Sequence, residues 1–206
     1  MAKSQHLKEH LVLLFLVTAA LIWSAVKPAS YLTWLLEVSP AVAGLLIAIL
    51  LYRRFRLTTL SYAIISLLAI SMFIGGHYVY SNVPLFNWVK DTFDLERNHY
   101  DRFGHFLKGL FAIVLREILL RKTSLTRGGW LFLIVMSMML AIAALYEIIE
   151  WIIGQLAKQV KQVQDFLGTQ GDIWDTQWDM LFCLIGSILA WLALSKIHDR
   201  FLKKPL

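Results

Sequence analysis

The stretch DRFGHFLKGLFAIVLRE, residues 101–117, decides what kind of fold this chain can adopt. It lies between two apolar segments and, with its flanking residues, is long enough to cross a bilayer, whose hydrocarbon core takes about 20 residues of helix. Yet six of its side chains are ionisable: Asp101, Arg102, His105, Lys108, Arg116 and Glu117. A charged side chain that faces lipid costs about 2.5 to 3.5 kcal/mol. If this stretch is a membrane span, its charges must therefore face other parts of the protein.

The composition of the chain is typical of an integral membrane protein. Of 206 residues, 58% are hydrophobic and 17% are charged, whereas soluble domains carry roughly 25% charged residues. The net charge of +6 does not indicate nucleic-acid binding, because the basic residues lie between hydrophobic runs and form no single patch. The lone cysteine, Cys183, excludes an internal disulfide. The lipid bilayer is the expected partner, for one integral membrane domain over residues 1–206.

Six segments have the length and apolar character of membrane spans. The predicted spans are 10–26, 33–52, 59–80, 100–120, 130–153 and 176–196. The fold class is therefore predicted to be all-α, a polytopic bundle of about six transmembrane helices. The first segment has a basic start like a signal peptide, but because more spans follow it we interpret it as an uncleaved anchor. In the second span, Pro40 predicts either a kink or a later start of the helix.

The distribution of lysine and arginine predicts the orientation of the bundle. Six spans place twelve of these residues on one side: Lys3, Lys8, Arg53, Arg54, Arg56, Arg121, Lys122, Arg127, Lys196, Arg200, Lys203 and Lys204. The opposite loops hold only five: Lys27, Lys90, Arg97, Lys158 and Lys161. Since cytoplasmic loops are enriched in basic residues, both termini are predicted to face the cytoplasm.

This topology brings ionisable residues from three spans to the outer leaflet. At 100° per residue, four residues of the fourth span fall within an arc of about 80°: Asp101, His105, Lys108 and Arg116. The same periodicity aligns the acids of the last two spans: Glu147 with Glu150, and Asp172 with Asp175 and Asp179. Because each set occupies one helix face, we expect the three faces to meet in one polar site.

Carboxylates gathered in this way cannot all stay ionised unless a cation compensates them or some are protonated. Carboxylate and imidazole ligands suit a divalent metal such as Mn, Zn or Mg, and the predicted ligands are Glu147, Glu150, Asp175 and Asp179. No HExxH spacing occurs, so a zincin-type site is not supported. The predicted catalytic residues are His105 and Asp101 as an acid/base pair, with Lys108 holding a phosphate. The resulting hypothesis is metal-assisted chemistry on an envelope lipid or lipid-linked intermediate.

Two other functions fit the same residues. The acids could relay protons or bind a cation in a coupled transporter, although the first three spans lack a matching set of acids. They could also recognise a partner in a non-catalytic membrane component. Single residues have plainer interpretations too: Asp172 as a helix cap, Arg102 and Arg116 as side chains reaching the membrane surfaces, and Glu117 as an i,i+4 partner of Arg121.

Four motifs resemble the YjdF family of uncharacterised bacterial inner-membrane proteins: NHYDRFGHF, REILLR, YEIIEW and GTQGDIWDTQWDM. This resemblance covers most of the chain and implies a multi-pass protein of the bacterial inner membrane. A more distant resemblance is to VanZ-like membrane proteins, whose pattern is matched by Asp101 to His105, by Glu147, and by Asp179 with Gly186. Glu150 and Cys183 depart from that pattern, where Gln and Asn are expected. The VanZ-like resemblance implies action near the cell envelope.

Overall fold

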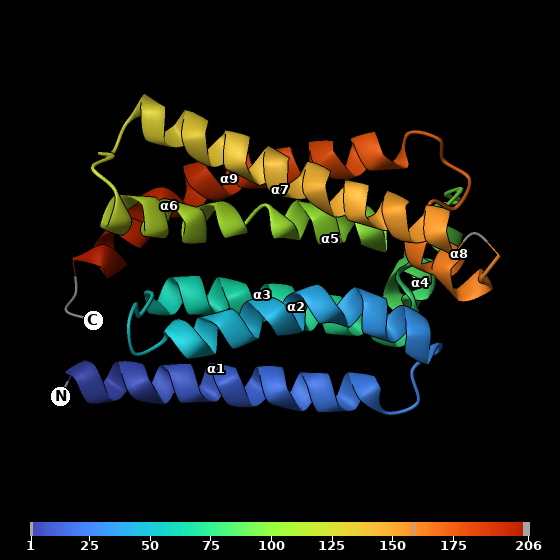
Figure 1. The fold of residues 1–206 in the computed structure, drawn as a ribbon, viewed down its shortest axis with the longest axis horizontal. Helices are drawn as coiled ribbons and strands as arrows, with labels where there is room; N and C mark the ends of the chain where they lie inside the picture. The colour runs from blue at the N-terminus through green and yellow to red at the C-terminus, as the bar shows by residue number, and fades with distance from the viewer. Residues whose placement is uncertain (1, 158, 204–206) are drawn as a thin grey trace.

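The chain folds into long, roughly parallel helices arranged in two layers, as Figure 1 shows for the computed structural model. The structure describes residues 2–157 and 159–203. Its elements are α1 (Ala2–Ala25), α2 (Tyr31–Leu51), α3 (Thr59–Tyr78), η1 (Tyr80–Asn82), α4 (Pro84–Thr92), α5 (Tyr100–Lys108), α6 (Phe111–Lys122), α7 (Gly129–Leu156), α8 (Lys161–Leu167) and α9 (Asp175–Leu202). Helices α1 to α3 form one layer, and α5, α6, α7 and α9 form the other. Both termini lie at one end of the bundle, which we call the terminal end; the end with α4 and α8 is the loop end (Figure 1).

Five of the described helices are long and apolar enough to cross a membrane: α1, α2, α3, α7 and α9. The fourth predicted span is divided into α5 and α6, which follow one another along the same line (Figure 1). Together they cover residues 100–122, or about 34 Å of helix at 1.5 Å per residue, which exceeds the ~30 Å hydrocarbon core. The all-α transmembrane bundle is thus confirmed, and six crossings fit it.

The junction of α5 and α6 is a tightened helical turn. Gly109 and Leu110 both have right-handed helical backbone angles. The bonds around them span three residues: Ala112 N to Gly109 O at 3.1 Å and Ile113 N to Leu110 O at 3.1 Å. Such 3₁₀-type bonds mark a local change of helical pitch rather than a reversal of the chain. The segment therefore remains one rod whose two halves can present different faces.

Two glycines let α5 and α9 approach closely. A Cβ atom on Gly186 would overlap the Phe106 carbonyl oxygen, and one on Gly109 would overlap the backbone at Ser187 and Cys183. Small residues at such crossings allow membrane helices to pack backbone against backbone. This contact fixes the position of the last turn of α5, which carries His105 and Lys108, relative to α9.

The first layer packs through an apolar core of its own. Its buried residues come from α1, α2 and α3: Val17, Val38, Ala41, Ala69, Met72 and Phe73. Helix α2 begins at Tyr31, where the Ser30 hydroxyl accepts a hydrogen bond from Thr33 N at 3.2 Å, so Pro40 lies inside the helix and does not start it. A second cluster, with residues from α3, α6 and α9, joins the layers: Leu57, Ile64, Ile113, Val114 and Ala190.

A buried ionic network holds the terminal end together. Arg121 donates to Glu117 at 2.6 Å, as the i,i+4 spacing predicted. Arg116 is buried, and it contacts His198 Nδ1 at 2.8 Å and Asp199 at 2.7 Å. The interpretation that Arg116 reaches the membrane surface is therefore wrong, because α9 offers these partners inside the bundle.

Candidate functional site

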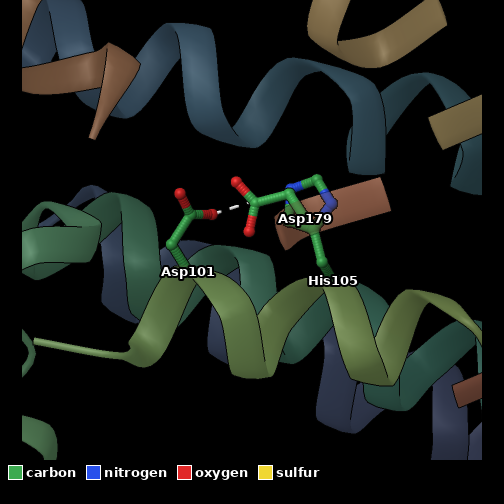
Figure 2. Close-up of side chains that lie close together, drawn as sticks. All are labelled: Asp101, His105 and Asp179. Carbon is green, nitrogen blue, oxygen red and sulfur yellow. Dashed lines mark ion pairs between the residues drawn. The ribbon is translucent and has the colours of Figure 1, made fainter. Parts of the chain in front are cut away.

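The predicted site residues of α5 and α9 face one another across the close helix crossing. Figure 2 shows Asp101 and His105 one turn apart on α5, with the Asp179 carboxylate between them and projecting from α9. One ligand atom from each of these three residues lies within 4.8 Å of the other two. The i,i+4 spacing of Asp101 and His105 places both on the face that the glycine contact turns toward α9. Three potential metal ligands therefore come together from two helices.

The imidazole of His105 is the centre of this group. Its Nε2 atom lies 3.7 Å from Asp101 Oδ1 and 3.6 Å from Glu147 Oε1 of α7. The same nitrogen lies 2.8 Å from Lys108 Nζ. Because an ammonium group only donates hydrogen bonds, Nε2 is the acceptor in this contact. Carboxylates from two helices and a lysine thus converge on one ring nitrogen.

Two carboxylate oxygens in the site have no hydrogen-bond donor among the described residues: Asp179 Oδ1 and Glu147 Oε1. Both side chains are almost fully enclosed, with 2% of Asp179 and 7% of Glu147 exposed. An unpaired buried polar atom costs about 1 to 3 kcal/mol. Buried oxygens of this kind call for a partner such as a proton, a water molecule or an ion. They therefore fit a bound cation.

Two further acids border the group. Glu150, one turn after Glu147 on α7, is half-buried and interacts electrostatically with Asp101 and Glu147. Glu37 of α2 is buried and interacts electrostatically with Asp101 and Lys108. Glu37 was not among the predicted site residues, although a lone glutamate in an otherwise apolar span is itself a signal of function. The first layer therefore contributes a carboxylate to the site.

Asp175 lies beside this group but has partners of its own. It forms ion pairs with Arg97 and Arg102, and Arg97 also donates to the Gly168 carbonyl at 3.2 Å. Both arginines also pair with Asp172. The interpretation of Arg102 as a side chain that reaches the membrane surface is wrong, because it lies in this network. Arg97 was likewise not recognised from sequence, since its partners are 70 or more positions away and only the fold brings them close.

The ion pairs of Arg97 and Arg102 connect the polar loops that cover the site at the loop end of the bundle. Asp172 accepts a hydrogen bond from Trp174 N at 2.9 Å. Helix α9 begins at Asp175 with Trp174 as its N-cap, so the interpretation of Asp172 as a helix cap is wrong. The Trp174 amide, together with Arg102, lowers the pKa of Asp172 below its ordinary value of 3.8. Partial burial and the two neighbouring arginines lower the pKa of His99. The carboxylates of Asp172 and Asp175 are thus balanced by neighbouring arginines, whereas those of Asp179 and Glu147 are not.

The loop before α9 is tied directly to the loop before α5. Asn98 N donates to Gln170 Oε1 at 3.0 Å, and Gln170 Nε2 donates to Asn98 O at 2.9 Å. Gly168, with φ of +63°, lies so close to Asp101 that an added Cβ would stand 3.2 Å from its Oδ2. Glycine suits this position because the backbone is left-handed and there is little room for a side chain. The loop before α9 therefore covers the Asp101 side chain on the side that faces the loop end of the bundle.

Comparison with known proteins places the chain in a membrane-protein family. Residues 9–200 match the model of a family described as "Predicted membrane protein (DUF2238)". The chain is 40% identical over 189 residues to the inner membrane protein YjdF of Escherichia coli strain K12, covering 91% of this chain and 90% of that protein. No solved structure matches the chain. The VanZ-like resemblance stays a prediction. The chain belongs to the DUF2238 family, and it is a multi-pass protein of the inner membrane.

Proposed function

We propose that this DUF2238 family member binds a divalent metal between α5, α7 and α9 and uses it in chemistry on an envelope lipid or lipid-linked intermediate. The observation that carries the proposal is a pair of enclosed oxygens that have no hydrogen-bond donor among the residues described, Asp179 Oδ1 and Glu147 Oε1, beside His105. A divalent cation would satisfy both oxygens and offset the repulsion between carboxylates that lie this close. Mixed oxygen and nitrogen ligands suit Mn, Zn or Mg.

The proposed ligands are Asp101, His105, Asp179 and Glu147. The first three offer ligand atoms within 4.8 Å of one another, and Glu147 Oε1 lies 3.6 Å from His105 Nε2. A metal on Nε2 would replace the hydrogen bond that this nitrogen accepts from Lys108. Asp175 is left out of this set because two arginines already neutralise it. We assign it to holding the loop in place instead.

The proposed chemistry is hydrolysis or group transfer at an ester of the lipid head. A metal makes bound water acidic and polarises a phosphoryl or carbonyl oxygen. Glu150, which borders the ligands, would accept the proton that this water loses, and Lys108 would hold the phosphate. The substrate class follows from location, because Glu147 and Asp179 lie on helices long and apolar enough to span a membrane, beneath the loop that covers Asp101.

The test is metal analysis by plasma mass spectrometry on the full chain purified in detergent without chelator. We expect near-stoichiometric metal in the wild type and loss of it in Asp179→Asn and Glu147→Gln, which keep side-chain size. Asp91→Asn is the matched control, because Asp91 is 73% exposed and lies outside the site. A wild type that stays metal-free after incubation with Mn, Zn and Mg would contradict the proposal.

A second candidate function is proton- or cation-coupled transport, and Glu37 is the observation that favours it. Its buried carboxylate brings the first layer to the site, which a transporter that moves its two halves against each other requires. In liposomes, a transporter would show pH-dependent flux that Glu37→Gln abolishes. A non-catalytic component would keep its cellular role when the acids of the site are neutralised.

A further inference from the structure

A large apolar cavity separates the two layers on the terminal side of the site. Its volume is about 380 Å³, within the range of about 300 to 1,000 Å³ typical of small-molecule pockets. Its walls come from α2, α3, α6 and α7, and they include Gly44, Leu68, Val114 and Met139. Because the lining is apolar, ordered water has few partners there. The cavity therefore suits a hydrocarbon occupant.

The cavity has one polar end. His105 and Lys108 line it together with Tyr146, whose ring centroid lies 3.9 Å from Lys108 Nζ. From there it follows α2 between Pro40 and Leu51. Eleven residue steps of helix rise about 16 Å, roughly half of the ~30 Å hydrocarbon core. A polar group at Lys108 would therefore have room behind it for a chain that runs toward the terminal end.

The cavity opens sideways toward the lipid. Ile47 of α2 and Ile142 of α7 both line it, yet 57% and 44% of these residues are exposed. Gly44, also in the lining, has open space around it, since no atom lies within 4 Å of a Cβ added there. A lipid chain could enter from the bilayer between α2 and α7 without passing through water.

We propose that this cavity holds one hydrocarbon chain of an anionic lipid whose phosphate lies at Lys108. The proposal rests on the proposed function and deepens it by naming the substrate class. Packing alone cannot select the occupant, because a lipid tail is as apolar in the bilayer as in the cavity. The cavity must therefore select its lipid through contacts with the lipid head group at the polar end. There Lys108 Nζ contacts His105 Nε2 and the Tyr146 ring but forms no direct ion pair with a carboxylate of the described residues, so a phosphate could form such a pair with it.

Photolabelling of the full chain in phosphatidylcholine liposomes tests this inference. Three probes carry a diazirine at the chain end: an isoprenyl monophosphate, a diacyl phosphatidate and a zwitterionic phosphatidylcholine. We expect labels on cavity residues such as Met139, with at least one anionic probe labelling about tenfold more than the zwitterionic probe, a factor that corresponds to ~1.4 kcal/mol. The anionic probe that labels more strongly identifies the source of the phosphate.

Two variants with a matched control make the result specific. Gly44→Trp fills the cavity and should remove its labelling, whereas Gly129→Trp, placed where added atoms also meet open space but outside the cavity, should not. Lys108→Met leaves the apolar lining intact and should abolish the preference for anionic probes. Equal labelling by all three probes, or cavity labelling unchanged in Gly44→Trp, would overturn the inference.

The metal proposal and the lipid inference can fail separately. Cavity labelling that persists in a metal-free wild type would leave the lipid site standing and remove the metal. Stoichiometric metal without cavity labelling would keep the metal site and overturn the lipid inference.

Discussion

Replacing Glu117 by glutamine should destabilise the terminal end of the bundle by about 3 kcal/mol. In the wild type, Oε1 accepts from Thr58 N at 2.9 Å and from Arg121 at 2.6 Å. Oε2 accepts from the Thr58 hydroxyl at 2.7 Å and from Ser61 at 2.6 Å, and it lies 3.3 Å from His198 Nε2. The carboxylate, which is fully buried, therefore binds segments from α3, α6 and α9 in one network.

The magnitude follows from these contacts. A glutamine whose oxygen faces Thr58 N and Arg121 turns its NH₂ toward two hydroxyls, which can rotate to accept. The bonds from Thr58 and Ser61 then survive without charge, the bond from Arg121 keeps only the charge of the guanidinium, and the contact with His198 is lost because two N–H groups would face each other. Each of the four surviving bonds loses about 1 kcal/mol, the difference between more and less charged hydrogen bonds. Arg121 recovers part of this loss from water, because 26% of its side chain is exposed. A net cost of about 3 kcal/mol also agrees with the ~3 to 5 kcal/mol typical of breaking a buried ion pair.

The assay is thermal unfolding of the detergent-purified protein, followed by tryptophan fluorescence. For a chain of this size, about 3 kcal/mol lowers Tm by roughly 6 to 12 °C. Glu96→Gln is the control, since Glu96 is exposed in the loop before α5. A shift below about 1 °C for Glu117→Gln would refute the reasoning, because the carboxylate could then not be the centre of the network.

Two more outcomes follow from the packing and the loops. Gly186→Ala should cost about 1 to 3 kcal/mol of stability and weaken metal binding as well, because the added methyl group overlaps the Phe106 carbonyl and must separate α5 from α9; unchanged Tm and metal content would contradict this. The carboxylate of Asp172 has a lowered pKa, so its contribution to stability is present above pH 3.8 and is lost as pH falls through the lower folded value. The Tm difference between wild type and Asp172→Asn should therefore shrink below pH 3.8, and a difference that stays constant down to pH 2 would argue against the role of the Trp174 amide and Arg102.

Much of the fold could be predicted from sequence because the bilayer limits the choices. Long apolar runs have few alternatives to spanning helices. The break between α5 and α6 was not predicted from sequence. Neither were the short helices α4 and α8, which lie in segments that were expected to be loops. These features depend on packing: the tightened turn lies where Gly109 meets α9, and a single-sequence pattern contains no such contact.

The candidate site could be predicted from helix faces and their topology, but not down to the partners of each acid. Periodicity put Asp101 and His105 on one face because their relation is local. The pairing of Asp175 with Arg97 depends on two loops that meet through Asn98 and Gln170, so spacing could not reveal it. The same pairing separates Asp175 from the acids that lack such partners. Helical periodicity thus identifies candidate ligands, but only the tertiary partners distinguish a neutralised acid from one that lacks a partner among the described residues.

The close crossing of α5 and α9 and the repulsion between the carboxylates of Asp101 and Asp179 have one physical origin. Gly109 and Gly186 draw the backbones of α5 and α9 together, and this same approach holds the carboxylates of Asp101 and Asp179 close to each other. Packing is favourable there, whereas two unscreened carboxylates at this separation repel, so a bound cation or a shared proton would stabilise the crossing as well as the site. A ligand at this position would therefore act on fold stability and on chemistry together. For this reason the metal content of the purified protein and the Tm of the glycine variant report on one coupled equilibrium.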